Sequence, residues 1–256
     1  MNIEKTKREI VQWIKDWFAK NGPDCNAIIG ISGGKDSSVA AALCVEALGK
    51  DRVYGILMPN GVQSDLDDSY KICKHLDIPC MTTNIEPIYD AFVKTIIYND
   101  ANWFNGKRNV LVPNRLSDQT KINLPPRIRM TILYAISQSV NGRVVCTDNL
   151  SESYIGYSTR WGDNVGDFAP LAYLTSEEVV ALGDACGLPH ELTHKTPADG
   201  LCGKTDEENF GFTYETLNKY ILTGQCEDKE AKEKIDAMHL KNAFKLKPIP
   251  AYIPHR

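Results

Sequence analysis

The chain has 256 residues, of which 43% are hydrophobic and 24% are charged, and its formal net charge is −4. This length can bury one large core, so we expect a single domain over residues 1–256. The net charge gives no electrostatic reason to expect nucleic acid as a partner, and no apolar stretch is long enough to cross a membrane.

The hydrophobic pattern predicts helices and strands that alternate along the chain. Helices are predicted over 3–20, 37–48, 64–76, 87–97, 127–140 and 175–186, the last of them opened by the capping box TSEE. Strands are predicted over 27–31, 53–58, 80–83 and 143–147. This alternation indicates an α/β fold, a Rossmann-like parallel sheet with helices on both faces and ligands at the carboxyl ends of the strands.

The N-terminus, the cysteines and two polar stretches indicate the location of the protein and its long loops. The first 18 residues form an amphipathic helix pattern and not a signal peptide. Eight cysteines are scattered without a C-x-x-C pair, which is typical of reduced thiols, so we expect a cytoplasmic protein. Two polar stretches, 98–124 and 189–211, lack periodicity and are predicted to be long binding loops or lids.

A short polar stretch, SGGKDS at 32–37, joins the first predicted strand to the next helix. Free backbone N–H groups and the positive end of a helix dipole converge at such a junction, and glycine lets an anion approach the backbone. The spacing excludes a Walker A loop, because three residues separate Gly30 from Gly34 and Asp36 follows Lys35. We therefore predict a phosphate-binding loop, with a plain capped glycine turn as the alternative.

Acidic residues in two places indicate a metal ion. Asp36 would repel a phosphate unless a cation intervened, and Mg²⁺ binds carboxylate and phosphate oxygens together. A second set of charged residues follows the strand over 143–147: Asp148, Glu152, Arg160, Asp163 and Asp167. Because parallel strands end at one edge of a sheet, a carboxylate of this set could complete a Mg²⁺ site. The alternative is a solvated acidic loop.

The SGGKDS stretch resembles the S-G-G-x-D-S loop of N-type ATP pyrophosphatases, which adenylate an oxygen with ATP and let a nucleophile displace AMP. Four further segments resemble, in order, those of ammonia-dependent NAD synthetases: LMPNGVQSDLDDS, NLPPRIRM, TDNLSE with RWGDNVGD, and HKTPADGLCGKTDEE. The resemblance spans nearly the whole chain and implies the adenine nucleotide alpha-hydrolase-like fold. It also implies amidation of deamido-NAD to NAD⁺ by ammonia, the last step of NAD biosynthesis, with release of AMP and pyrophosphate.

The resemblance further implies roles for single residues. The ATP-binding residues would be Gly30, Ser32, Gly33, Gly34, Lys35, Asp36, Ser37, Thr147 and Lys195. The residues that contact deamido-NAD would be Arg127, Arg160, Asp167 and Lys245. Mg²⁺ would be held by Asp36 and Glu152, and the catalytic residues would be Lys35, Asp36 and Asp163. Asp163 is our candidate base for ammonium, and an exposed helix arginine is the alternative for Arg127.

Some positions depart from the family pattern. Ser176 stands where the family usually has a lysine and Ala198 where it has serine or threonine, and both family residues are expected to contact the β and γ phosphates. Lys195 and Lys204 are the cations that could replace the missing charge. The family's C-terminal H-K-R is FKL here, which keeps only Lys245.

The resemblance also bears on partners. Nothing in this length is left over for a glutaminase domain, so we expect ammonia to be free or to come from a separate protein. The family is usually homodimeric, and the stripe of Ile10, Trp13, Ile14, Trp17 and Phe18 could serve as the interface or as core. Two other functions stay open: another N-type ATP pyrophosphatase, such as a thiolation enzyme, and a non-catalytic nucleotide-binding module.

Overall fold

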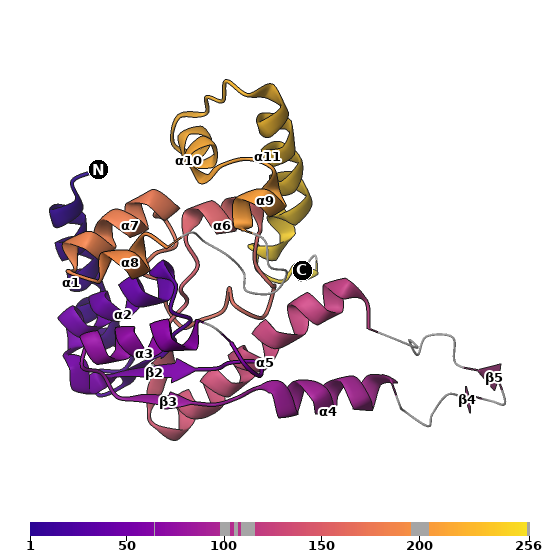
Figure 1. Cartoon of the computed structure of the whole chain (residues 1–256), viewed down its shortest axis with the longest axis horizontal. Helices are drawn as coiled ribbons and strands as arrows, with labels where there is room; N and C mark the ends of the chain where they lie inside the picture. Colours follow the sequence, from indigo (N-terminus) through magenta and orange to yellow (C-terminus); the bar gives the residue numbers. More distant parts are fainter. Residues whose placement is uncertain (64, 98–102, 105–106, 109–115, 196–204, 255–256) are drawn as a thin grey trace.

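The computed structural model describes residues 1–63, 65–97, 103–104, 107–108, 116–195 and 205–254. A parallel sheet of four strands in the order β3-β2-β1-β6 runs through it (Figure 1). The strands are β1 (Asn26–Gly30), β2 (Val53–Leu57), β3 (Cys80–Thr82) and β6 (Gly142–Val144). The predicted α/β fold with a Rossmann-like parallel sheet is confirmed.

Helices cover both faces of this sheet. Successive residues of a strand point to opposite faces, so the apolar side chains on each face are buried under a separate set of helices. Ala27 and Ile29 of β1 belong to the core beneath α1 (Ile3–Asn21), α2 (Lys35–Leu48), α3 (Leu66–His75) and α7 (Ser176–Ala185). The residue between them, Ile28, belongs to the core beneath α4 (Glu86–Ile97) and α5 (Asp118–Ser139). One period-2 strand thus builds two cores.

A third, smaller core lies outside the sheet. It is built around Ile155, Leu217 and Ile235, all three fully buried. The helices that supply it are α6 (Leu150–Ile155), α9 (Asp206–Phe210), α10 (Tyr214–Thr223) and α11 (Lys229–Asn242). The other elements are η1 (Lys50–Arg52), β4 (Trp103–Phe104), β5 (Lys107–Arg108), α8 (His190–Thr193) and η2 (Ala243–Lys245). In Figure 1 the four helices of the third core, α6, α9, α10 and α11, lie near α7 and away from β3.

The apolar stripe of α1 is part of the first core. Ile14 and Phe18 are fully buried, and the Trp17 ring stacks on Phe168 with 4.7 Å between centroids. Trp13 remains 44% exposed at the edge of this stack. Of the two alternatives for the stripe, core packing is the one observed.

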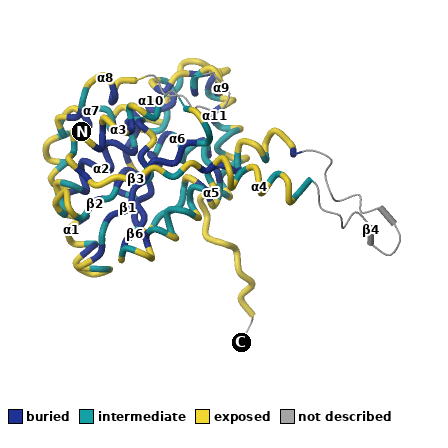
Figure 2. Tube along the Cα trace, turned by 60° about the horizontal axis from the view of Figure 1, so that its bottom comes forward, coloured by how far each residue is buried: buried dark blue, intermediate teal, exposed yellow. Residues whose placement is uncertain are grey.

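The helices α4 and α5 project from the body of the molecule (Figures 1 and 2). No residue of α4 is fully buried, and Ile88 and Phe92 are 39% and 49% exposed. With Ile122 of α5, which is 43% exposed, they form apolar surface that the described residues leave exposed.

Most predicted elements are confirmed to within a few residues, but the predicted loops are partly wrong. α5 begins at Asp118 and continues through Pro125 and Pro126, although the prolines were expected to precede the helix. Its first half buries Leu124, Pro125 and Ile128, and such packing supplies most of the stability of a helix in a protein. The stretch 189–211 likewise contains α8 and α9.

Two details of the helices concern their first residues. The capping box of α7 is confirmed: Thr175 accepts from the N–H of Glu178, whose side chain accepts from the N–H of Thr175. α3 begins at Leu66, and Ser64, the first residue of the helix predicted over 64–76, lies outside the described residues. Nowhere in the described chain is a helix both long and apolar enough for a membrane span.

Candidate nucleotide site

The SGGKDS loop connects the carboxyl end of β1 to the first turn of α2. Gly33 adopts φ +80°, a conformation that side chains disfavour. A Cβ atom there would lie 3.0 Å from the backbone N of Ser69 and 3.0 Å from Cβ of Asp68. The loop is therefore packed tightly against the start of α3, and this position requires glycine.

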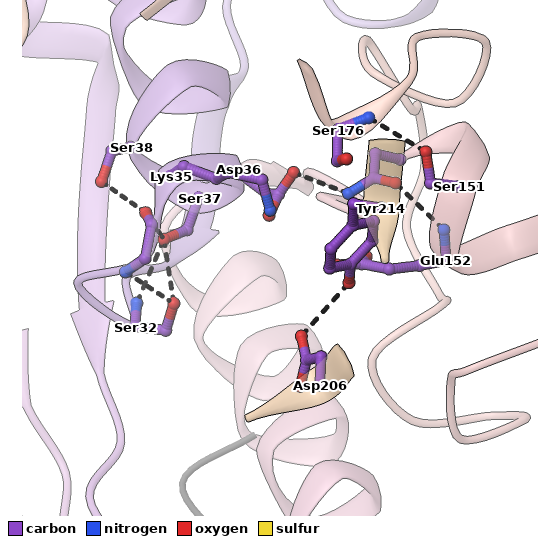
Figure 3. Close-up of polar contacts among 12 residues, drawn as sticks. Ser32, Lys35, Asp36, Ser37, Ser38, Ser151, Glu152, Ser176, Asp206 and Tyr214 are labelled. Atoms are coloured by element: carbon purple, nitrogen blue, oxygen red, sulfur yellow. Dashed lines mark hydrogen bonds and ion pairs between the residues drawn. The ribbon is translucent and has the colours of Figure 1, made fainter. Parts of the chain in front are cut away.

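Serine hydroxyls hold the loop from within (Figure 3). Ser32 Oγ accepts from the N–H of Gly34 at 3.2 Å and lies 3.1 Å from Ser37 Oγ, while Ser38 Oγ donates to the carbonyl of Gly34 at 2.7 Å. No side chain caps α2. Its first backbone N–H groups therefore remain available to an anion.

Asp36 connects the loop to the start of α6. Its Oδ2 accepts from Lys35 Nζ at 2.8 Å, and its Oδ1 accepts from Asn149 Nδ2 at 2.9 Å. Asn149 is fully buried at the N-cap of α6, where its Oδ1 accepts from the N–H of Glu152 at 3.0 Å. One asparagine thus fixes Asp36 and Glu152 beside each other.

Two carboxylates of this region, Glu152 and Asp148, have raised pKa values. Desolvation raises the pKa of Glu152 well above its ordinary value, and Asp36 raises it further, while Lys35 lowers it. Desolvation also raises the pKa of Asp148 well above its usual range, with contributions from Asp163 and Asp36. Asp148 is 8% exposed, and its Oδ2 has no hydrogen-bond partner among the described residues.

Lys35 is the cation among these acids. Burial lowers the pKa of its ammonium, but Asp36 and Glu152 raise it, and the net shift is upward. Its Nζ lies 5.7 Å from the ring centroid of Tyr214, whose hydroxyl donates to Asp206 Oδ2 at 3.2 Å (Figure 3). The first residue of α10 therefore lies over the lysine of the loop.

A cavity of about 730 Å³ lies between the loop and these carboxylates. The predicted residues that line it are Gly30, Ser32, Gly34, Lys35, Asp36, Ser37, Thr147, Glu152, Asp163 and Lys195. Gly33 shapes the loop behind it. The structure thus brings together the predicted ATP-binding, metal and catalytic residues, although they come from distant parts of the sequence.

Asp36 and Glu152 also fit the donor set that Mg²⁺ prefers. Both are oxygen ligands, and the raised pKa of Glu152 means that a second positive charge would be favourable beside it. Among the described residues, no group of three or more His, Cys, Asp or Glu side chains is arranged as a metal site. Phosphate oxygens and water would therefore have to complete the coordination, as is usual for Mg²⁺.

Asp163 lies at the mouth of the cavity. Its Oδ1 accepts from the N–H groups of Thr159 at 2.6 Å and Asn164 at 3.0 Å. Desolvation raises its pKa, and these N–H groups lower it by less. A carboxylate with a raised pKa is a better base near neutral pH.

The four residues expected to bind deamido-NAD do not line the cavity. Arg127 is exposed, and its Nε donates to the carbonyl of Arg160 at 3.3 Å. The Arg160 guanidinium lies over the rings of Trp161 and Phe244, 4.9 and 5.4 Å from their centroids. Arg160 and Trp161 directly precede Gly162 and Asp163, which do line the cavity.

The other two are held by the protein backbone. Lys245 Nζ donates to the carbonyls of Gly156 at 2.7 Å and Ser158 at 3.0 Å. Asp167 Oδ2 accepts from the N–H of Val144 at 2.7 Å. In this conformation both side chains tie the segment 156–167 to its surroundings.

Ser176 is buried away from the cavity, although the family's lysine at this position is expected to contact phosphate. Its N–H donates to Ser151 Oγ at 3.0 Å, and its Oγ accepts from Asn218 Nδ2 at 3.2 Å. Ser151 Oγ in turn donates to Asn218 Oδ1 at 2.6 Å, which closes the ring of bonds. Of the two lysines that could replace the missing charge, Lys195 lines the cavity, and Lys204, like Ala198, lies outside the described residues.

Sequence reasoning missed three side chains of the site. Asn149 was findable, because an asparagine three residues before Glu152 is an N-cap pattern. Tyr214 comes from a helix that was not predicted. Arg129 was noted in the NLPPRIRM match but given no role, and it lines the cavity where Arg127 does not.

Fold and site together indicate an α/β protein of the nucleotide-binding class. A family model described as NAD synthase matches residues 6–249. The chain belongs to the NAD synthase family.

Relatives and solved structures agree with this assignment. The chain is 36% identical over 236 residues to an NH(3)-dependent NAD(+) synthetase of Thermococcus sibiricus, covering 92% of this chain and 86% of the relative. It is 38% identical to that of Methanocaldococcus jannaschii, covering 85% and 81%. The solved NMN synthetase from Francisella tularensis has a TM-score of 0.84 at 31% identity, with 100% of both chains covered. The NH3-dependent NAD synthetase from Campylobacter jejuni has a TM-score of 0.76 at 27% identity, covering 99% and 100%.

Proposed function

We propose that the chain makes NAD⁺ from deamido-NAD, ATP and ammonia through an adenylated intermediate, releasing AMP and pyrophosphate. The observation that carries this proposal is the cavity in which the SGGKDS loop, with its own Asp36, faces Glu152 and Asp163. The family assignment and the NAD synthetase relatives give the reaction its class. The arrangement of charges supports its two steps.

In the first step, a nicotinate oxygen attacks the α-phosphorus of ATP, and the bond to the β-phosphate breaks. Lys35 and the free N–H groups of α2 are placed to bind the pyrophosphate as its charge develops. Mg²⁺ held by Asp36 and Glu152 would neutralise part of that charge. Lys195, which forms an ion pair with Asp68 at 2.9 Å, is placed to replace the family's missing lysine.

In the second step, ammonia attacks the activated carbonyl carbon, and AMP leaves. The proton that the nitrogen gives up needs an acceptor, and Asp163 at the cavity mouth has the raised pKa of a usable base. We further propose that Arg127 and Arg160 contact the acid substrate next to that mouth, with Lys245 and Asp167 positioning the segment 156–167.

The proposal extends to partners. Ammonia is the nitrogen source, either free or from a separate protein. The protein is a homodimer, and the apolar surface of α4 and α5, with Ile88, Phe92 and Ile122 exposed, is the candidate interface.

The test is pyrophosphate release from ATP, which should require deamido-NAD, ammonium and Mg²⁺ together. Pure glutamine without ammonium should support little turnover, and the total ammonia needed should fall as the pH approaches about 9, because only NH₃ is nucleophilic. Equal rates with glutamine alone, or no pyrophosphate release under any combination, would contradict the proposal. In the second case a non-catalytic binding module would be the better account.

A mononucleotide is a second candidate substrate, favoured by the similarity to the solved NMN synthetase over the full length of both chains. Nicotinate mononucleotide carries the same carboxylate but lacks the adenylate half. Comparing kcat/KM for the mononucleotide and deamido-NAD decides between them.

Arg127→Ala should raise KM for the preferred acid substrate with little effect on KM for ATP, and the loss of a charge-assisted contact costs about 1.5–3 kcal/mol. If the variant raises only the KM for ATP, Arg127 contacts ATP and not the acid substrate, and our assignment is wrong.

A further inference from the structure

Arg129 of α5 is a charged residue of the cavity that has no acidic partner among the described residues. Its Nε donates to the carbonyl of Met58 at 2.9 Å, and the side chain is half-buried in the cavity wall. No carboxylate of the described residues lies within ion-pair distance of its guanidinium. Asp65 and Asp163 act on it only from farther away.

The other described cations of the cavity differ in this respect. Lys35 is paired with Asp36 at 2.8 Å, and Lys195 is paired with Asp68 at 2.9 Å. Burial lowers the pKa of Arg129 below its ordinary value, which shows that the protein around it disfavours the charge. A guanidinium nevertheless stays protonated, so the charge persists without compensation. A bound anion would supply the missing partner.

The surroundings of Arg129 indicate which anion this is. Met58, Pro59 and Leu133 line the cavity beside it, next to Gly30 at the end of β1. An apolar wall of this kind suits a flat purine. The phosphate loop, by contrast, lies at the start of α2. Arg129 therefore lies on the nucleoside side of the cavity, where the phosphate nearest to the ribose would reach it.

We propose that Arg129 binds the α-phosphate of ATP and keeps the adenylate in place through both steps, an inference that rests on the proposed function. In the first step the α-phosphate passes through a five-coordinate arrangement whose oxygens carry added charge. In the second, ammonia attacks the acyl carbon, the acyl–oxygen bond breaks, and its electron pair leaves with AMP. AMP thus gains a negative charge beside the guanidinium, and the planar fork of arginine matches two phosphate oxygens.

Binding of AMP and of pyrophosphate, measured by calorimetry with the full chain, tests this role. Arg129→Gln should weaken AMP about tenfold or more, because a charge-assisted contact is lost, and should change Mg²⁺-pyrophosphate binding by less than about twofold. Arg129→Lys should recover only part of the AMP affinity, because it keeps the charge and loses the fork. Arg143→Gln serves as a control, since Arg143 bonds to the carbonyl of Asn21 far from the cavity.

Thermal unfolding separates this role from a structural one. Removing an uncompensated charge should leave the melting temperature of the ligand-free protein unchanged or raised. If Arg129→Gln lowers that temperature and weakens AMP and pyrophosphate equally, Arg129 merely supports the Met58 segment and the inference is overturned. Unchanged AMP affinity overturns it as well. Because AMP binding is measured without the acid substrate, a wild-type protein that binds AMP through Arg129 but releases no pyrophosphate would contradict the proposed function alone.

Discussion

The cavity has two walls, the loop at 32–37 and the segment 148–163, and they differ in how well their polar groups are satisfied without a ligand. In the loop at 32–37, the hydroxyls of Ser32, Ser37 and Ser38 bond within the loop and to its backbone. In the wall formed by residues 148–163, Asp148 and Glu152 have strongly raised pKa values, and one oxygen of Asp148 has no partner among the described residues.

The loop wall contributes a fixed backbone geometry to the site, whereas the acidic wall contributes negative charge. The loop has its geometry fixed by glycine and serine, so it can present backbone N–H groups to an anion at once. The acidic wall is built at the expense of stability, because carboxylates resist burial beside one another. Under the proposed function, a cation that enters with the nucleotide would make this wall favourable. The predictions below test whether the walls act together in this way.

The largest effect is expected from removing the charges on both sides of the metal. Asp36→Asn and Glu152→Gln should each lower Mg²⁺-dependent turnover about 100-fold or more. The double variant should lose little more activity than the less active of the two single variants, because the effects of residues that act as a unit are not additive. The measurement is kcat at saturating substrates. Fully additive losses would show that the two carboxylates do not share one ion.

The loop itself should be sensitive in stability. Gly33→Ala forces a side chain into φ +80° and against the backbone of Ser69, so it should lower the free energy of unfolding by about 2 kcal/mol. Gly34→Ala is the matched control: Gly34 has φ −84°, and an added Cβ would meet Ser32 Oγ alone, at 3.3 Å. It should change stability by no more than about 0.5 kcal/mol. Urea unfolding compares them, and equal losses would contradict the packing argument.

The acidic wall should make stability depend on pH in the absence of ligands. The pKa values of Asp148 and Glu152 are raised in the folded state, so between about 4 and those raised values the folded state binds more protons than the unfolded one. Their contribution to stability is therefore full below about pH 4 and is lost as the pH rises through the folded pKa values. Each unit of upward shift corresponds to about 1.4 kcal/mol.

Urea unfolding at a series of pH values measures this dependence. Asp148→Asn should flatten it, whereas Asp51→Asn, on the exposed η1, should leave it unchanged. A wild-type protein whose stability rises steadily from pH 5 to 8 without ligands would contradict the strained acidic wall.

The smallest effect concerns the contact that covers Lys35. Tyr214→Phe keeps the ring and loses the bond to Asp206, so kcat should fall about threefold. Tyr214→Leu removes the ring as well and should cost about tenfold. Equal losses in the two variants would show that the hydroxyl alone matters, and no loss in either would remove Tyr214 from the site.

The sequence predicted the loop wall better than the acidic wall, for a physical reason. The loop is local: a strand, two glycines and a helix start are neighbours in the chain, and their spacing determines the geometry. The acidic wall depends on contacts between distant segments, such as Asn149 with Asp36 and Tyr214 with Lys35. Nothing in the local pattern fixes those contacts.

The errors in the fold have the same origin. Pro125 and Pro126 are poor helix residues locally, yet α5 includes them because Leu124 and Ile128 bury against the sheet. α6, α10 and α11 were not predicted, and they are held by a separate core around Ile155 and Leu217. Ser176 was noted only as a departure from the family's lysine, and the structure shows this serine in a buried network.

Binding of a non-hydrolysable ATP analogue with and without Mg²⁺ tests most directly whether the two walls meet on one metal–nucleotide complex. The wild-type protein should bind α,β-methylene-ATP about tenfold or more tightly with Mg²⁺ than with a chelator. Glu152→Gln should bind it equally well in both conditions, because the loop still accepts the phosphates but the cation has lost its second carboxylate. The same Mg²⁺-dependent gain in both proteins would contradict the account and would leave Glu152 a carboxylate of the cavity wall with no metal to bind.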